Sequence, residues 1–291
     1  MSVYAGRHDA DATRAATWDR RRVVATNLRS VLGRAYPRFL GLTREPSWLF
    51  FEVLLPLLST FAFVFVYRAL QAPEQYVGFV VLGGAMTAFW SNVVWGMAAQ
   101  LYWERDGGNL ELYFTAPISM MSVLLGMAFG GLVSTSLRAA VVLAIGTAIF
   151  GVTYGVTDWA ALGAVFVLTM AALYGLGMLL ASVFLMWGRE GFHLSQLLTE
   201  PVYFFGGVYA PLRALGPIGA LAVSILPLAT GLDAIRQIAF PGPDSAGVFP
   251  VPVEIGILVV MTVAFGAAAR LSLRTLERLA RREGRLTVRW R

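Results

Sequence analysis

Cysteine and lysine are both absent from this chain of 291 residues, and histidine occurs only as His8 and His193. Without cysteine there can be no disulfide framework and no thiolate metal site. Without lysine the chain cannot contain the phosphate-binding G-x-x-x-x-G-K-[ST] loop. There is no H-x-x-x-H or G-x-S-x-G pattern, so a metal site or a histidine-based triad is poorly supported. We expect no catalytic residue, no bound metal and no cofactor held by this chain, although a mechanism built on carboxylates alone stays open.

Charge is also scarce, since 14% of the residues are charged and 57% are hydrophobic. Soluble domains typically carry about 25% charged residues. No charged residue occurs between Leu54 and Tyr67 or between Val77 and Tyr102. Uncharged runs of this length match a hydrocarbon layer about 30 Å thick, whereas buried helices of a soluble protein give shorter runs. The sequence therefore predicts an all-α polytopic membrane protein.

The arginines gather at the two ends of the chain. Nine lie between Arg7 and Arg44 and eight between Arg270 and Arg291, and the formal net charge is +6. Basic residues that flank apolar spans follow the positive-inside rule, so we expect no nucleic-acid partner. Both termini should then face the cytoplasm, which requires an even number of crossings. No cleavable signal peptide is expected, because the first apolar run begins only near Trp48.

Six membrane-spanning helices are predicted from the hydrophobic runs. Their approximate limits are Trp48–Ala69, Tyr76–Leu101, Ser119–Phe150, Trp159–Trp187, an irregular fifth region from Leu197 to Pro211, and Val251–Arg270. Glycine and proline interrupt residues 212–240, which predicts short re-entrant helices that dip into the outer leaflet without crossing it. Residues 46–271 would form the membrane domain, followed by a basic cytoplasmic tail at 272–291.

The segment before the first span has its own character. Residues 1–13 are small and polar, and we expect them to be disordered. Residues 14–45 carry apolar side chains at helical spacing with arginines beside them, which predicts an amphipathic helix in the membrane interface, bent or broken at Pro37. An ordinary soluble amphipathic helix is the alternative. The predicted apolar stripe consists of Val24, Leu28, Val31, Ala35, Phe39 and Leu42.

The polar segment 103–117 separates the second and third spans. Leu110 to Thr115 could form a short rigid element, since Gly107 and Gly108 permit a turn before it and Pro117 ends it. Its charged residues would face a partner surface, and its apolar residues would anchor there. A merely solvated loop is the alternative. The charged residues are Glu104, Arg105, Asp106 and Glu111, and the apolar ones are Leu112, Tyr113 and Phe114.

Two stretches resemble the type-2 ABC exporter permease family. The first is ERDGGNLELYFTAPIS at residues 104–119, followed by LLG at 124–126; the second is GGVYAP at 206–211, followed by LPL at 226–228 and DAIR at 233–236. The resemblance runs from about residue 17 to the end of the chain. It implies that residues 103–117 form a coupling segment that seats in an ATPase subunit. The coupling residues would be Glu104, Arg105, Asp106, Gly107, Leu110, Glu111, Tyr113, Thr115 and Pro117, and the outer re-entrant residues Pro211, Pro227, Asp233 and Arg236.

The resemblance also implies a function. It would make the chain a permease of the cytoplasmic membrane that exports an amphipathic organic substrate by alternating access. Two soluble ABC ATPase subunits would hold the ATP and magnesium, and a second permease copy or a paralogue would complete the pathway. Export of lipid-linked glycans is an alternative within the family. An intramembrane enzyme and a passive scaffold or insertion factor are alternatives outside it.

Ionisable residues inside spans are costly and are therefore functional candidates. Arg138 and Glu200 could line a polar pathway or form a pair that joins helices; alternatively, Glu52 and Glu200 stay in the interface and Arg138 extends toward it. The candidate pathway residues are Phe89, Trp90, Asn92, Arg138, Glu200, Tyr203 and Phe204, although the aromatic ones could equally be interfacial or core residues. Gly126 and Gly130 form a small-xxx-small step that predicts close helix packing.

Overall fold

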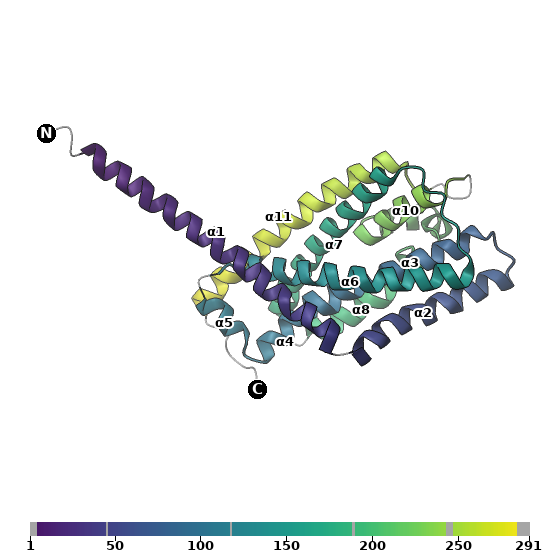
Figure 1. Cartoon of the computed structure of the whole chain (residues 1–291), viewed down its shortest axis with the longest axis horizontal. Coiled ribbons are helices and arrows are strands. Elements are labelled where there is room, and N and C mark those ends of the chain that lie inside the picture. Colours follow the sequence, from purple (N-terminus) through teal and green to yellow (C-terminus); the bar gives the residue numbers. More distant parts are fainter. Residues whose placement is uncertain (1–4, 45, 117, 188–189, 243–246, 284–291) are drawn as a thin grey trace.

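The computed structural model describes residues 5–44, 46–116, 118–187, 190–242 and 247–283. These residues form helices joined by turns and loops, with no strand among them, which confirms the all-α prediction. The long helices run side by side along one bundle, and the N-terminal helix projects away from it (Figure 1). Residues 103–116, which belong to the predicted coupling segment, lie at one end of this bundle. We call the opposite end the distal end.

Five helices of the described chain are long and apolar enough to cross a membrane. They correspond to the first four predicted spans and the last. The five are α2 (Pro46–Ala69), α3 (Gln75–Val93) with its continuation through the π-helical turn η1 (Val94–Ala99) into α4 (Gln100–Asp106), α6 (Met120–Phe150), α7 (Trp159–Trp187) and α11 (Val251–Glu283).

The predicted fifth span differs from these five. It is the helix α8 (Glu190–Phe205), which has 16 residues and contains Pro201. A spanning helix requires about 20 apolar residues, so α8 alone is too short to cross. Three short elements follow it: the 3₁₀ turn η2 (Leu212–Leu215), α9 (Gly216–Val223) and α10 (Pro227–Ala239). The helix breaks fall at Gly216 and Pro227, two of the glycine and proline positions in residues 212–240, whereas Gly231 lies inside α10.

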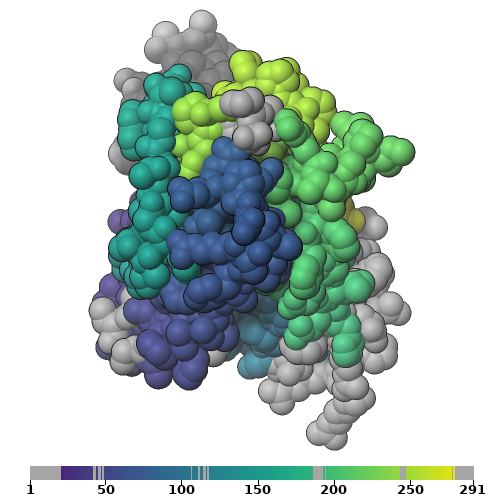
Figure 2. Space-filling view, turned by 90° about the vertical axis from the view of Figure 1, so that its right-hand side faces the viewer, coloured from purple at the N-terminus to yellow at the C-terminus, as the bar shows by residue number. Residues whose placement is uncertain are grey.

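The central helix of the bundle is α3. In its most apolar window 83% of the residues are buried, against 17% in α2 and 11% in α11. A helix that is apolar on every side can be surrounded by other helices, whereas most apolar side chains of α2 and α11 are not buried within this chain. Figure 2 views the distal end, with the turn between α2 and α3 in blue at its centre.

The N-terminal helix α1 (Ala5–Arg44) begins earlier than the sequence predicted and continues through Pro37 without a break. Residues 5–13 are thus helical where a disordered tail was expected. Alanine is frequent there, and alanine has the highest helix propensity of all residues. Residues 1–4 and the end of the basic tail, 284–291, lie outside the described residues.

Helix α1 packs against α6 through two glycines. A Cβ atom on Gly126 would lie 2.7 Å from the carbonyl oxygen of Val31, and one on Gly130 would lie 3.0 Å from that of Ala35. Only a residue without a side chain permits so close an approach of two helices. The packing role predicted for these two glycines is confirmed, and their partner is α1.

The face that α1 turns toward the bundle is largely polar. The side chains of Asn27, Ser30 and Arg34 all contact other helices. The opposite face is apolar, with exposed fractions of 58% to 64% for Val24, Leu28, Leu32 and Tyr36. The predicted apolar stripe is therefore divided, because Ala35 is buried against α6 while Val24 and Leu28 face outward.

The packing of α1 on α6 gives a first prediction. Gly126→Ala should lower the free energy of unfolding by about 1 to 3 kcal/mol, because the added methyl overpacks the contact with Val31. Gly163→Ala in α7 is the matched control, since no atom lies within 4 Å of its Cβ position. Denaturant unfolding in detergent micelles measures both. Equal stability of the two variants would contradict the packing role of Gly126.

Candidate functional site

The coupling segment folds into a helix, a glycine turn and a second short helix. Helix α4 ends at Asp106, and Gly108 has a φ angle of +79°, a conformation that side chains disfavour. The amide of Asn109 donates to the carbonyl oxygen of Glu104 at 2.9 Å and closes the turn. Helix α5 (Leu110–Thr115) follows, and Ala116 before Pro117 is extended. The short helix predicted from the sequence is therefore present.

Three side chains fasten this segment to the bundle. Glu104 is buried and forms an ion pair with Arg34 of α1. Arg105 Nη1 donates to the carbonyl oxygen of Leu185, near the end of α7, at 2.7 Å. Leu110 is only 1% exposed. In the described chain, Glu104 and Arg105 thus hold the segment in place, whereas the sequence analysis had directed their charges toward a partner.

Of the described side chains of α5, that of Leu112 is the most exposed. Leu112 is 66% exposed. Tyr113 is partly buried, and the guanidinium of Arg34 lies 5.9 Å from the centre of its ring. Arg34 therefore contacts both helices of the coupling segment. The side chains of Asp106, Glu111, Phe114, Thr115 and Pro117 lie outside the described residues.

A second set of contacts joins α1 to the start of α6. Asn27 Oδ1 accepts hydrogen bonds from the amide of Ser119 at 3.0 Å and from Ser122 Oγ at 3.2 Å. Ser30 Oγ lies 2.9 Å from Ser122 Oγ. Ser119 is also the N-cap of α6, because its hydroxyl accepts from the amide of Ser122. The start of α6 is thus held by its own cap and by α1.

Further along the bundle, five helices contribute to a layer of polar side chains that we call the polar layer. Its members are Arg38 of α1, Glu52 of α2, Asn92 of α3, Thr135 and Arg138 of α6, and Tyr174 of α7. Arg138 forms an ion pair with Glu52 and donates to Thr135 Oγ1 at 2.9 Å. The hydroxyl of Tyr174 donates to Asn92 Oδ1 at 3.1 Å. Of the alternatives for Arg138, the structure shows the pair that joins two helices.

Arg38 has a different environment from Arg138. Its guanidinium donates to the carbonyl oxygen of Gly96, within the π-helical turn η1. Burial lowers the pKa of Arg38, and the nearby charge of Arg34 lowers it further. Arginine nevertheless remains protonated in proteins. Arg38 is thus a half-buried cation, and among the described residues no carboxylate forms an ion pair with it.

The candidate pathway residues do not form one group. Phe89 and Trp90 are at most 2% exposed and belong to the core, where the ring of Phe89 lies 5.7 Å from that of Phe166. Glu200 and Phe204 lie on exposed parts of α8. Tyr203 is a neighbour of these two, and its hydroxyl is hydrogen-bonded to Ser91 of α3.

The residues predicted for the outer region tie loops to helices. Arg236 is fully buried and donates to the carbonyl oxygens of Phe79 at 2.7 Å and Val208 at 2.8 Å. Asp233 Oδ2 accepts from the amide of Val248 at 2.7 Å. Pro211 precedes η2, and Pro227 is the first residue of α10. These contacts assign Arg236 and Asp233 a structural role at the distal end.

Sequence analysis missed the parts played by Arg34, Arg38, Ser122 and Tyr174. The spacing of Arg34 and Arg38 by four residues on one face of a helix was visible in the sequence. These arginines were interpreted as the basic edge of an amphipathic helix in the membrane interface. No comparable pattern marks Tyr174, which lies in an uninterrupted apolar run.

The ion pair between Arg34 and Glu104 gives a second prediction. Arg34→Gln should lower the free energy of unfolding by about 3 kcal/mol, because it leaves the buried carboxylate of Glu104 without a positively charged partner. The double variant R34Q/E104Q should recover most of that loss, since two neutral amides remain. A double-mutant cycle measured by unfolding in micelles gives the coupling energy. Strictly additive effects would contradict the pair.

The chain was compared with known protein families and with curated proteins. A family model described as ABC-2 type transporter matches residues 36–240, from within α1 to the residue after α10. This range includes the coupling segment and every member of the polar layer. Among curated proteins, none matches the chain significantly. Because the family model covers more than two thirds of the chain, and the helices that it covers are built to cross a membrane, the chain belongs to the ABC-2 type transporter family as a multi-pass permease.

Proposed function

We propose that the chain is the permease subunit of an ATP-driven exporter. Two copies of a soluble ABC ATPase would bind ATP and magnesium, and a second permease copy or a paralogue would complete the pathway. One observation carries this proposal. In a chain of the ABC-2 type transporter family, the predicted coupling segment is held to α1 by the ion pair between Glu104 and Arg34, and it exposes Leu112. An exposed leucine on a short helix is the kind of anchor that a partner groove can bury.

The contacts around Arg34 support a mechanical role for the segment. Arg34 joins α1 to Glu104 of α4 and to Tyr113 of α5, and α1 in turn packs closely on α6. Arg105 joins the same segment to α7. A displacement of α5 by the ATPase would therefore move the near ends of several spanning helices together. Packed interfaces of this kind switch between discrete arrangements, as alternating access requires.

We further propose six crossings, with both termini in the cytoplasm. Helix α8 begins three residues after α7 ends, whereas α10 ends at the distal end, where the amide of Gly155 donates to the carbonyl oxygen of Ala239. The chain therefore passes along the bundle between Trp187 and Ala239. This passage, made by α8 and the short elements after it, would be the fifth crossing in chain order, and it brings the number of crossings from five to six.

For the substrate we propose an amphipathic organic molecule. Phe204 and Phe205 of α8 are more than half exposed, and Glu200 is exposed on the same helix. Aromatic faces beside a carboxylate suit a molecule with both apolar and polar parts. A lipid-linked glycan is the alternative within the family. The alternatives outside the family, a passive scaffold and an intramembrane enzyme, differ from a transporter subunit in that they would function without an ATPase.

The proposal predicts that Leu112→Asp separates the permease from its ATPase. A charge at the anchor should weaken co-purification of the ATPase by at least about tenfold, since a buried charge without a partner costs several kcal/mol. ATP-driven transport should fall by the same factor. Leu70→Asp is the matched control, because Leu70 is 71% exposed beyond the distal end of α2.

Transport by inside-out vesicles that contain the permease and the ATPase measures the second effect. Accumulation of a fluorescent amphipathic cation or anion inside these vesicles corresponds to export. Unchanged association in the Leu112→Asp variant would contradict the anchor. Transport in the opposite direction only would contradict export and leave the anchor intact.

Since the natural chain contains no cysteine, single cysteines can report the orientation directly. Leu70→Cys should react with a membrane-impermeant maleimide in intact cells. Val23→Cys, Leu112→Cys and Arg278→Cys, all at exposed positions, should react only after permeabilisation. Labelling of Arg278→Cys from outside, with Val23→Cys protected, would mean five crossings instead of six.

A further inference from the structure

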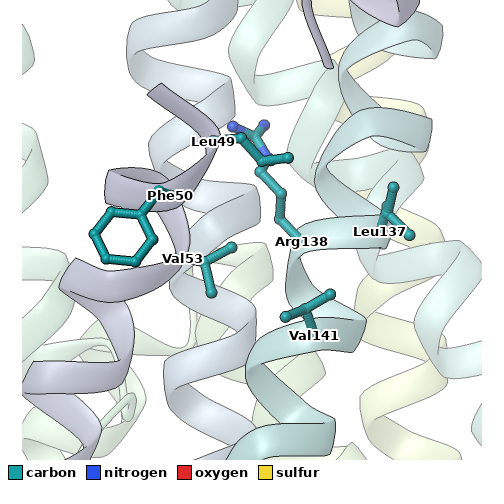
Figure 3. A pocket seen from close by; sticks show the side chains of 6 residues that line it. All are labelled: Leu49, Phe50, Val53, Leu137, Arg138 and Val141. Atoms are coloured by element: carbon teal, nitrogen blue, oxygen red, sulfur yellow. The ribbon is translucent and has the colours of Figure 1, made fainter. Parts of the chain in front are cut away.

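The carboxyl groups that the described chain shields from water are of two kinds. Glu52 forms an ion pair with Arg138, whose guanidinium lies between α2 and α6 among apolar side chains (Figure 3). Asp233 of α10 and Glu254 of α11 are only 4% and 1% exposed, and among the described residues no cation forms an ion pair with either. A buried charge without a partner is costly, so these two groups must be accommodated in another way.

Asp233 and Glu254 meet at the distal end, where α10 packs on the first turn of α11 (Figure 1). The carboxyl of Glu254 is hydrogen-bonded to that of Asp233. Gln237, one turn after Asp233, donates from Nε2 to Glu254 Oε2 at 3.0 Å. A Cβ atom on Gly247 would clash with both Asp233 Oδ2 and Gln237 Nε2, so these two polar atoms lie close together. We call Asp233 and Glu254 the acid pair.

A hydrogen bond between two carboxyl groups requires a hydrogen on one of them. An ionised carboxylate can only accept hydrogen bonds, and two carboxylates in contact repel each other strongly. The amide of Val248 donates to Asp233 Oδ2 at 2.7 Å, and the charge of Arg236 is close enough to act on Asp233. Both favour the ionised form of Asp233, which leaves the hydrogen on Glu254.

The groups around the acid pair suit one negative charge. Arg236 donates to the carbonyl oxygens of Phe79 and Val208, and no ion pair links it to a carboxylate of the described chain. Helices α3 and α7 also pack on α10, with the uncharged side chains of Phe79 and Thr169 against it. The backbone amides in the first turn of α11 stabilise a nearby negative charge. Further ionisable side chains on neighbouring elements, for which the described chain shows no hydrogen bond to the pair, are Tyr67, Tyr76, Tyr154 and Asp158.

We propose that Asp233 and Glu254 share one proton, and that this proton closes a clasp between α10 and the start of α11. The clasp also holds the chain just before α11, because Asp233 accepts from the amide of Val248 and Gln237 Nε2 donates to the carbonyl oxygen of Phe249 at 2.9 Å. Loss of the proton places two negative charges against each other and opens these contacts. The distal end is thereby sensitive to the pH of the solution that it faces.

Unfolding of the full-length protein in detergent micelles, measured from about pH 5 to pH 8, tests the shared proton. Unfolded aspartate and glutamate side chains are ionised over this range. A folded state that holds one proton more than the unfolded chain loses stability as the pH rises, so its unfolding constant should increase about tenfold per pH unit from this group. Glu254→Gln keeps the shape and the hydrogen bonds of a protonated carboxyl and should remove this increase.

Two control variants each remove a carboxyl group elsewhere near the distal end. Glu74→Gln changes an exposed residue, and Asp244→Asn changes the acidic residue closest in sequence to Gly247. Both should keep the pH dependence of the wild type. If Glu254→Gln keeps it as well, or if Asp244→Asn removes it, the acid pair holds no extra proton and the proposal is wrong.

Hydrogen exchange tests the opening of the clasp. At one alkaline pH, the amide of Val248 should exchange faster in the wild type than in Glu254→Gln, because only the wild type can lose the proton. Comparison at a single pH removes the intrinsic effect of pH on exchange. Equal protection in the two proteins would show that the contacts of Val248 do not depend on this proton, contrary to the proposal.

Infrared spectroscopy of the unmodified protein covers the case in which Glu254→Gln does not fold. A protonated carboxyl group absorbs apart from ionised carboxylates. The wild type should show the band of a protonated carboxyl at neutral pH and lose it reversibly at alkaline pH. A spectrum without this band at neutral pH would overturn the proposal. None of these measurements involves the ATPase, so their outcome is independent of the proposed transport activity.

Discussion

A guanidinium group that is removed from water must find hydrogen-bond acceptors in the protein, and the position of α1 follows from this constraint. Arg34 and Arg38 lie on one face of α1, and that face turns toward carboxylates and carbonyl oxygens of other helices. The apolar face, with Val24, Leu28, Leu32 and Tyr36, is left exposed. Most soluble amphipathic helices have the reverse arrangement.

The need to cross a hydrocarbon layer explains which helices could be predicted from the sequence. Long apolar runs mark α2, α3, α6, α7 and α11, because each crossing of the bilayer needs about 20 consecutive apolar residues. The limits of α8 could not be predicted in this way, since Pro201 and two glycines interrupt the apolar run. Its place depends on contacts with α3 and α7, which a hydropathy pattern does not record.

The candidate site was predicted in position but not in orientation. A turn at Gly108, a helix from Leu110 and an end before Pro117 are local features, so the sequence was sufficient for them. Glu104 was expected to face a partner because a charge in a polar segment is usually solvated. Its actual neighbour, Arg34, is 70 residues away in sequence, and the packing of α1 on α6 brings the two together.

The π-helical turn η1 determines which way the side chains after it point. A π turn accommodates one residue more than an α turn, so the side chains beyond it are rotated by about 100° relative to an uninterrupted α-helix. Glu104 faces Arg34 only with this rotation included. A regular α-helix through the same residues would carry Glu104 and the whole coupling segment to another side of the bundle, whereas deletion of a single residue between Val94 and Ala99 would straighten the helix and keep the segment on its present side. The irregular turn thus sets the direction in which the coupling segment points.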